Sequence, residues 1–176
     1  NSAYDAFVHE TYTQVPDETR QALSDILSEL VGEEDADPYQ YIPRVLEYVS
    51  TSARYDLNTP AVPDGEDFVS WFLHDSETGY CVHYATAATI LLRCLGVPAR
   101  YVTGYYTDVY ENEWTTVTSD DAHAWVEIYL NGIGWLRDDP TPAADTPAQT
   151  APEEPIAAPI EPADNQPEDT PPAGDE

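Results

Sequence analysis

Apolar residues recur at helical spacing in two stretches of the N-terminal part of the chain. In PDETRQALSDILSELVGEE (residues 16–34), Leu, Ile and Val recur every three or four residues after an acidic opening, and Gly32 closes the pattern. This pattern predicts one helix. A second helix is expected around Pro43–Ala53, whereas residues 1–16 have no clear period and are interpreted as an arm that packs on the domain. The apolar residues on the inner side of the second helix are Val45, Leu46 and Val49.

A longer apolar stretch, GYCVHYATAATILLRCLGVPARYVTGY, forms the middle of the sequence. It begins at Gly79, interpreted as a flexible entry, and predicts a helix from Cys81 to Leu95. Gly96 fits the position just past a helix C-terminus, and the proline two residues later prevents the helix from resuming. A cysteine therefore lies in the first turn of a helix that is apolar enough to be buried.

Alternation of apolar and polar residues predicts strands after this helix. Arg100–Tyr106 has strand character, His123–Leu130 alternates, and Trp135–Asp139 returns beside it after a turn. Residues 107–121 read as a polar loop or a ragged hairpin. Helices followed by an antiparallel hairpin predict one α+β domain. In it, the central helix packs on an antiparallel sheet of three or more strands.

The composition changes abruptly near the C-terminus. Residues 143–176 contain eight prolines and nine acidic residues, with no basic and no aromatic residue. Such a segment cannot bury enough apolar surface to offset the entropy of ordering it. We expect a catalytic domain over residues 1–142 and an acidic, Pro-rich tail or linker over residues 143–176. An alternative is that the tail lies in a substrate groove.

The charge balance excludes two classes of partner. The chain has 34 acidic and 6 basic residues, a net charge of −28, and all six basic residues are Arg. Such acidity repels phosphate backbones and anionic membrane surfaces, so we expect neither nucleic-acid binding nor direct membrane contact. No apolar run approaches the length of a membrane span. A first residue Asn1 in place of Met suggests a fragment or a processed chain.

The two cysteines are expected to be free thiols with different environments. Cys81 and Cys94 lie thirteen residues apart on one predicted helix, or about 20 Å at a rise of 1.5 Å per residue. A disulfide allows no more than about 7 Å between Cα atoms. Cys94 lies among leucines and reads as a small buried hydrophobe. Cys81 lies at a helix N-terminus, whose N–H groups and dipole favour a thiolate and lower the pKa of the thiol.

Only one of the four histidines is a good candidate for the base that such a nucleophile needs. His9 and His74 lie in surroundings that suggest no role. His83 lies two residues after Cys81, points to roughly the opposite side of the helix, and is expected to be solvated or hydrogen-bonded. A metal site formed by Cys81, His83 and His123 is therefore disfavoured. His123 opens a predicted strand, where an imidazole can be held rigidly.

A carboxylate on the return strand would orient the imidazole. Asp138 and Asp139 are both available, but only one can share the face of His123 because side chains alternate along a strand. A three-residue turn after Leu130 makes Asp139 a diagonal neighbour of His123. A two-residue turn would select Asp138 instead. We favour Asp139 because Pro140 ends the strand there.

Cysteine, histidine and aspartate in this order form a nucleophilic triad. His123 takes the thiol proton, Asp139 holds the ring, and Cys81 attacks an acyl carbon. The resulting acyl-enzyme passes its acyl group to an amine or to water, and no cofactor is needed. The backbone N–H of Cys81 and one further donor would hold the oxyanion. Candidates for that donor are Trp71, Tyr80 and Tyr84.

Three blocks of this sequence resemble the transglutaminase-like superfamily, which has a papain-like core. They are the stretch from Gly79 to Tyr105, DAHAWVEIYLNGIGW, and DPTP, and the similarity spans most of residues 1–142. The resemblance implies the same roles for Cys81, His123 and Asp139. It also implies a protein or peptide substrate, with cell-envelope proteins among the candidates. Some animal members require calcium, but no acidic loop here has calcium-ligand spacing, so no metal is expected.

The arrangement is most similar to bacterial membrane proteins that carry this domain outside the cell. The resemblance therefore implies an extracellular or cell-surface location, with this piece tethered to the membrane in a longer protein. One departure is Val82, where members often carry an acidic residue. Members transfer acyl groups to amines, hydrolyse amides or peptides, or have lost catalysis. We therefore expect thiol-dependent acyl transfer or amide hydrolysis, with a catalytically silent binding or scaffold domain as the alternative.

Overall fold

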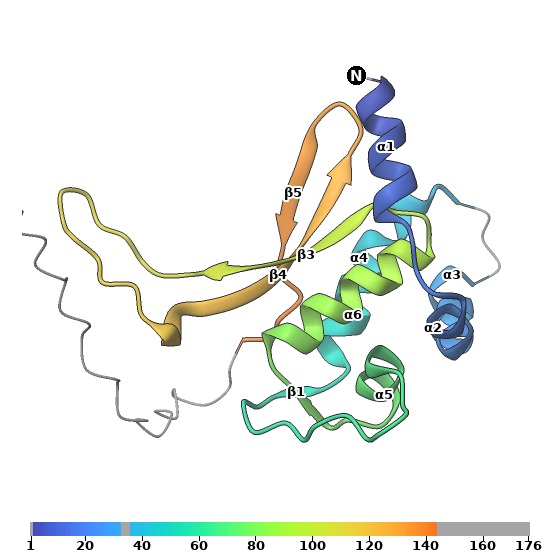
Figure 1. Ribbon diagram of the computed structural model, residues 1–176, viewed down its shortest axis with the longest axis horizontal. Coiled ribbons are helices and arrows are strands. Elements are labelled where there is room, and N and C mark those ends of the chain that lie inside the picture. Colours follow the sequence, from blue (N-terminus) through green and yellow to red (C-terminus); the bar gives the residue numbers. More distant parts are fainter. Residues whose placement is uncertain (1, 33–35, 144–176) are drawn as a thin grey trace, which may run out of the picture. The chain divides into compact units, whose positions relative to one another are not determined.

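The helix predicted at Cys81 is the central element of the fold. The computed structural model describes residues 2–32 and 36–143, and Figure 1 labels its elements. The central helix is α6 (Cys81–Cys94). Gly96 has a positive φ of 85°, and the N–H of Val97 donates to the carbonyl of Leu92 at 2.9 Å. The helix therefore ends in a Schellman motif, as the glycine predicted.

In the described part of the chain, five α-helices precede α6, two of them not expected from the sequence. The helix predicted over residues 16–34 is broken into two at Leu23, which is fully buried and has φ −102° and ψ 10°. The N-terminal segment, for which the sequence predicted no regular element, forms a helix over residues 2–12. The five are α1 (Ser2–Tyr12), α2 (Asp17–Ala22), α3 (Ser24–Val31), α4 (Ile42–Thr51, after a 3₁₀ turn at Pro38–Tyr41) and α5 (Phe68–His74).

The main sheet has three antiparallel strands in the order β3-β4-β5, which confirms the α+β class. On the second hairpin, Leu130 pairs with Gly134 and Val126 pairs with Asp138. This register is that of the three-residue turn, and the next position along the strand places Asp139 opposite Trp125. The strands are β3 (Ala99–Tyr105), β4 (Ala122–Leu130) and β5 (Gly134–Asp138).

A short parallel pair, which the sequence did not predict, leads into α6. β1 (Arg54–Tyr55) pairs with β2 (Thr78–Gly79), so Tyr55 lies beside Gly79. A Cβ on Gly79 would lie 2.5 Å from the ring of Phe72, closer than real Cβ atoms approach their neighbours. Gly79 is therefore a point of close packing at the start of α6 and not a flexible entry.

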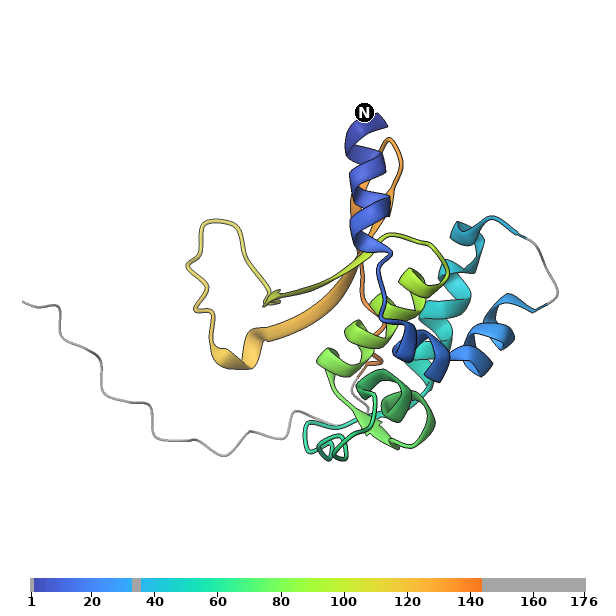
Figure 2. The same cartoon turned by 45° about the vertical axis from the view of Figure 1, so that its right-hand side comes forward.

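Helix α6 lies between the sheet and the other helices, with β3 and β4 on one side and α4 and α5 on the other (Figures 1 and 2). Its alanines at positions 85, 87 and 88 are fully buried, which lets neighbouring elements approach closely. On β4 the side chains of Ala124, Val126 and Ile128 are buried at alternate positions, as a half-buried strand requires. The rest of the core comes from buried residues of α3, α4 and α5.

Helix α1 is attached to the β4–β5 hairpin, beside which it lies in Figure 1. The Tyr129 hydroxyl donates to Asp5 at 2.6 Å, and the Trp135 indole N–H donates to the Tyr4 hydroxyl at 3.2 Å. The rings of Tyr12 and Trp135 meet edge to face at 4.9 Å. The N-terminal segment thus packs on the domain as expected, although as a helix. Of the tail predicted at residues 143–176, all but Ala143 lies outside the described residues.

Candidate active site

Cys81 is the first residue of α6, and its side chain is nearly enclosed. It is 9% exposed and packs with Ala85 and Ala124. Ala124 follows His123 on β4, so the N-terminus of α6 packs against the end of the strand that carries His123. A helix N-terminus against a strand end is the junction that the sequence predicted for these two residues.

His123 and Asp139 are in direct contact. The Nε2 atom of His123 lies 2.6 Å from Oδ2 of Asp139. Burial raises the pKa of the Asp139 carboxyl, but the hydrogen bond from His123 and the N–H of Thr141 outweigh burial and leave that pKa below its ordinary value. Asp139 is therefore an ionised acceptor, and Nε2–H is the donor. Nδ1 is then the ring nitrogen left to face a thiol.

The two neighbouring aspartates have different contacts. The carboxylate of Asp138 is exposed and accepts the backbone N–H of Asp139 at 2.8 Å. The Asp139 oxygen that contacts His123 also lies 3.5 Å from the guanidinium of Arg137. Asp139, and not Asp138, thus contacts the ring, in agreement with the register of the hairpin.

The pKa of the Cys81 thiol is raised, not lowered as its position on the helix suggested. Burial is the largest cause, and the negative charge of Asp139 adds to it. The backbone N–H of Ala124, on β4, acts in the opposite direction, and so do the N–H groups of Val82 and Cys81 at the helix N-terminus. In the free protein they do not outweigh burial, so Cys81 is mainly a thiol at neutral pH and needs a base to become a nucleophile.

This balance predicts how alkylation of Cys81 depends on pH. In a Cys94→Ser background, we expect iodoacetamide to label Cys81 with an apparent pKa above that of an ordinary thiol, about 8.5. Asp139→Asn removes an opposing negative charge and should move the profile to lower pH. Intact-mass labelling between pH 6 and 10 measures both profiles. A shift to higher pH in Asp139→Asn would mean that Asp139 instead supports a thiolate through protonated His123.

Three tyrosines lie around Cys81, and two of them were missed in the sequence. Tyr80 packs against the Cys81 side chain and its neighbours. Burial, followed by the charge of a Cys81 thiolate, raises the pKa of Tyr55 and of Tyr101, so both hydroxyls are close enough to interact with that charge. Tyr55 reaches the site through the β1–β2 pair and Tyr101 through β3. Neither pairing leaves a local motif, and no pattern in the sequence could have found them.

The proposed donors for the oxyanion differ in availability. The hydroxyl of Tyr84 donates to the carbonyl of Ala53 at 2.9 Å and is fully buried, so it is already used. The ring of Trp71 is buried beside His83, at 6.3 Å between centroids. Of the three candidates, Tyr80 is the one that packs against Cys81.

His83 has a structural role at the start of α6. Its Nδ1 atom accepts the backbone N–H of Tyr80 at 3.3 Å, and its ring stacks on Phe68 at 5.0 Å. It is 4% exposed, and burial lowers its pKa. Of the two alternatives that the sequence offered, a solvated or a hydrogen-bonded helical histidine, the structure shows the second, with the ring packed against α5.

Aromatic rings flank the imidazole of His123. The ring of Tyr106 lies 6.1 Å from it and that of Trp125 lies 6.3 Å from it, and the guanidinium of Arg137 lies over both aromatic rings. A Cβ on Gly104 would lie 2.7 Å from the indole of Trp125, so this strand position accepts only glycine without movement. These rings limit the orientations open to His123.

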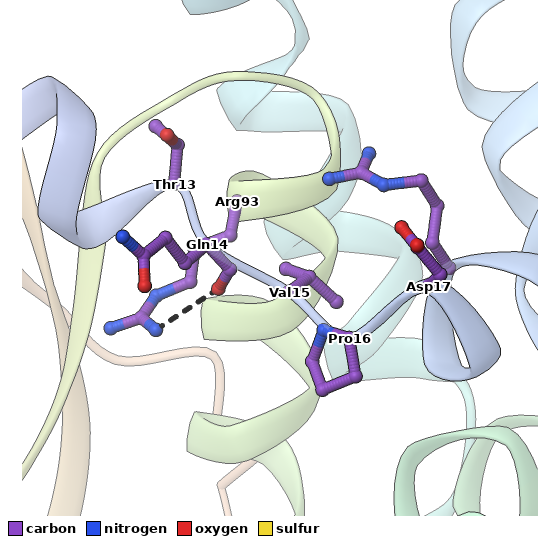
Figure 3. Close-up of a pocket in the computed structure, with 7 residues that line it drawn as sticks. Thr13, Gln14, Val15, Pro16, Asp17 and Arg93 are labelled. Atoms are coloured by element: carbon purple, nitrogen blue, oxygen red, sulfur yellow. Dashed lines mark hydrogen bonds between the residues drawn. The ribbon is translucent and has the colours of Figure 1, made fainter.

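A separate hollow of about 610 Å³ lies near the other end of α6 (Figure 3). It is lined by residues 13–17, Arg20 and Arg93. Arg20 donates to the carbonyl of Cys94 at 2.7 Å, and Arg93 donates to the carbonyls of Ala99 and Gln14. Both guanidinium groups thus hold backbone segments together, so we interpret this hollow as structural.

No helix within residues 2–32 and 36–143 combines the length and the apolar character needed to cross a membrane.

Comparisons with known proteins identify a family and a fold. The family model of the transglutaminase-like superfamily matches residues 25–140. An uncharacterised protein of Bacillus subtilis, YebA, is 32% identical over 146 residues, covering 78% of this chain and 20% of that protein. A protein-glutamine gamma-glutamyltransferase of Pseudomonas aeruginosa is 44% identical over 89 residues, covering 49% of this chain and 13% of that protein.

A solved structure shares the fold. The crystal structure of the periplasmic domain of TgpA from Pseudomonas aeruginosa, bound to ethylmercury, superposes with a TM-score of 0.61 at 33% identity. The match covers 77% of this chain and 49% of that one. This chain therefore spans at most about half the length of the proteins described here.

Proposed function

The chain belongs to the transglutaminase-like superfamily, and from this membership and its site geometry we propose that it is a cysteine acyltransferase acting on protein or peptide amides. The observation that carries the proposal is the 2.6 Å contact between His123 and Asp139, at the strand end that packs against Cys81. Family relatives are cysteine enzymes, and thiol-dependent acyl transfer is their general chemistry. The roles of the three residues and the direction of the reaction are the parts proposed for this chain.

The proposed reaction has two halves. His123 accepts the thiol proton through Nδ1 while Asp139 stabilises the charged ring, and the sulfur of Cys81 attacks the amide carbon. The C–N bond breaks, and the proton on His123 goes to the departing nitrogen, which leaves as ammonia. The acyl group remains on Cys81 as a thioester. In the second half an incoming neutral amine attacks the thioester carbon and gives a proton to His123. The C–S bond then breaks, and the proton passes from His123 to the sulfur of Cys81.

The charges and hydrogen-bond donors at the site would favour these steps. The carbonyl oxygen becomes negative in each half and needs donors, which the free N–H groups at the start of α6 and Tyr80 would supply. Because Cys81 is mainly a thiol, catalysis depends on the transfer of its proton to His123. Asp139, with a lowered pKa, remains ionised and holds His123 in the required tautomer across the neutral range.

Transfer to an amine is proposed ahead of hydrolysis. The relative with the highest identity among those described is a protein-glutamine gamma-glutamyltransferase. We therefore propose a glutamine side chain as the acyl donor and a primary amine as the acceptor, with water as a competing acceptor. The structural neighbour is a periplasmic domain, which supports an extracellular or periplasmic location and a membrane tether in a longer protein.

The test separates the two acceptors. The chain is incubated with a glutamine-containing protein and a fluorescent primary amine, while the release of ammonia is measured in parallel. We expect amine incorporation that matches ammonia release and falls to background without the glutamine donor. Ammonia release without amine incorporation would identify an amidase. Absence of both, over a panel of glutamine and peptide substrates, would contradict the proposal.

A catalytically silent binding domain of the same fold is the second candidate. The observation in its favour is the enclosure of Cys81, which is 9% exposed and has a raised pKa. A domain that never uses its thiol could tolerate such burial. Selective labelling of Cys81 by an electrophilic glutamine analogue would remove this candidate, because labelling requires both access and a base.

A further inference from the structure

The loop between β3 and β4, residues 106–121, exposes large aromatic side chains and is called the arm below. Figures 1 and 2 show it projecting from the sheet, away from the helices. Trp114 is fully exposed, and Tyr110 and Tyr106 are 65% and 62% exposed. Aromatic groups of this size are rarely left in water on a surface without a partner. Val109 and Val117 add to the exposed apolar surface of the arm.

The arm is also strongly acidic. It carries five carboxylates, and residues 101–136 contain no Lys and no Arg. The backbone N–H of Thr118 holds the pKa of Asp121 below its ordinary value, which keeps that carboxylate charged. The carboxylates of the arm are Asp108, Glu111, Glu113, Asp120 and Asp121. The exposed rings thus lie in a negative field with no cation of their own on the arm.

The base of the arm is joined to the site. The N–H of Tyr106 donates to the carbonyl of Asp121 at 2.8 Å and closes the loop where β3 and β4 separate. The Tyr106 ring lies 6.1 Å from that of His123, and Arg137 stacks on Tyr106 while approaching Asp139. A polypeptide bound along the arm would therefore end beside the triad.

We propose that the arm binds a segment of the substrate polypeptide rich in Lys or Arg. Cationic side chains stack on exposed Trp and Tyr faces, and neighbouring carboxylates add charge attraction to that contact. Charge excludes the other occupants: a second copy of this chain carries −28 and no Lys, and anionic membranes are repelled. The inference rests on the proposed function only in naming the bound segment a substrate.

Binding is measured with the full chain carrying Cys81→Ala, so that no turnover occurs. The ligand is a twelve-residue peptide of alternating Arg and Gly, which offers neither glutamine nor lysine. We expect saturable binding by calorimetry, weakened by salt. Trp114→Ala should raise Kd about threefold, and Trp114→Ala with Tyr110→Ala should raise it about tenfold.

Matched variants distinguish the arm from the acidity of the whole chain. Ile133→Ala truncates another exposed apolar side chain and should leave Kd unchanged. Glu111→Gln with Glu113→Gln should weaken binding and reduce its salt dependence. Asp64→Asn with Glu66→Gln removes two exposed charges from the loop before α5. This control should weaken binding and reduce its salt dependence far less than the arm variant does.

Three results would overturn the proposal. The first is that the arm variants and their controls weaken peptide binding equally. The second is that the peptide shows no saturable binding. The third is binding of neutral phosphatidylcholine vesicles that is lost in Trp114→Ala while peptide binding is unchanged, which would make the arm a membrane-contacting element. Normal peptide binding by a chain that transfers no acyl group would contradict the proposed function alone. An active enzyme whose arm variants bind normally would contradict this inference alone.

Discussion

Replacement of Cys81 by alanine is expected to lower kcat/KM for acyl transfer by at least about 10⁴-fold. The reason is that the thioester cannot form without the sulfur, and direct attack of an amine on an unactivated amide is extremely slow. The measurement is incorporation of a fluorescent amine into a glutamine-containing protein. The buried neighbours of Cys81, Ala85 and Ala124, are small, and alanine removes only the sulfur atom, so the variant should fold with little change in thermal stability.

The chain provides its own control for this experiment. Cys94 is the other free thiol, on the same helix but thirteen residues away, and burial also raises its pKa. Cys94→Ser should retain activity within about twofold, because that thiol lies far from the triad. Equal loss in both variants would indicate a general effect on folding. Retention of activity in Cys81→Ala would contradict the proposed mechanism directly.

The elements that carry the site could be predicted because local signals define them. The helix at Cys81 has an unambiguous end at Gly96, and the β4–β5 turn has a length that fixes the pairing. A shift of one residue in that pairing would have replaced Asp139 by Asp138 on the face of His123. The choice of Asp139 thus depended on the length of one turn, which the sequence left open between two and three residues and the structure shows to be three.

Features that depend on distant parts of the chain could not be predicted. The N-terminal helix has aromatic residues without helical period because they contact a hairpin more than a hundred residues away, as Tyr4 contacts Trp135. The β1–β2 pair is two residues long and leaves no periodic signal. It nevertheless brings Tyr55 to the site.

The pKa of Cys81 shows the limit of an argument from one element. A helix N-terminus lowers the pKa of a thiol, and its N–H groups do so here. The opposing causes come from elsewhere: burial against β4 and the charge of Asp139, which directly follows β5. Because the sequence does not reveal how deeply a side chain is buried, the net direction of the pKa could be found only from the structure.

His123→Ala is the second substitution with a large expected effect, a loss of about 10⁴-fold in kcat/KM. His123 has two roles, taking the proton of a thiol whose pKa is raised and giving a proton to the leaving nitrogen. Because the thiol pKa is high, residual activity should increase with pH, where hydroxide can replace the missing base. The pH–rate profile of the variant, set beside that of wild type, measures this dependence. A flat profile at low activity would mean that the thiolate is formed without His123.

Asp139→Asn should lower kcat/KM about 10²-fold or more and should not add to the loss in His123→Ala, because Asp139 supports catalysis through the ring that it contacts at 2.6 Å. The double variant is therefore expected within about threefold of His123→Ala alone. Asp138→Asn is the matched control, since the same change one residue earlier leaves the contact with His123 in place and should reduce activity no more than about threefold. Additive losses in the double variant would show that Asp139 acts independently of His123. A loss much greater than threefold in Asp138→Asn would show that the wrong aspartate had been assigned to the triad.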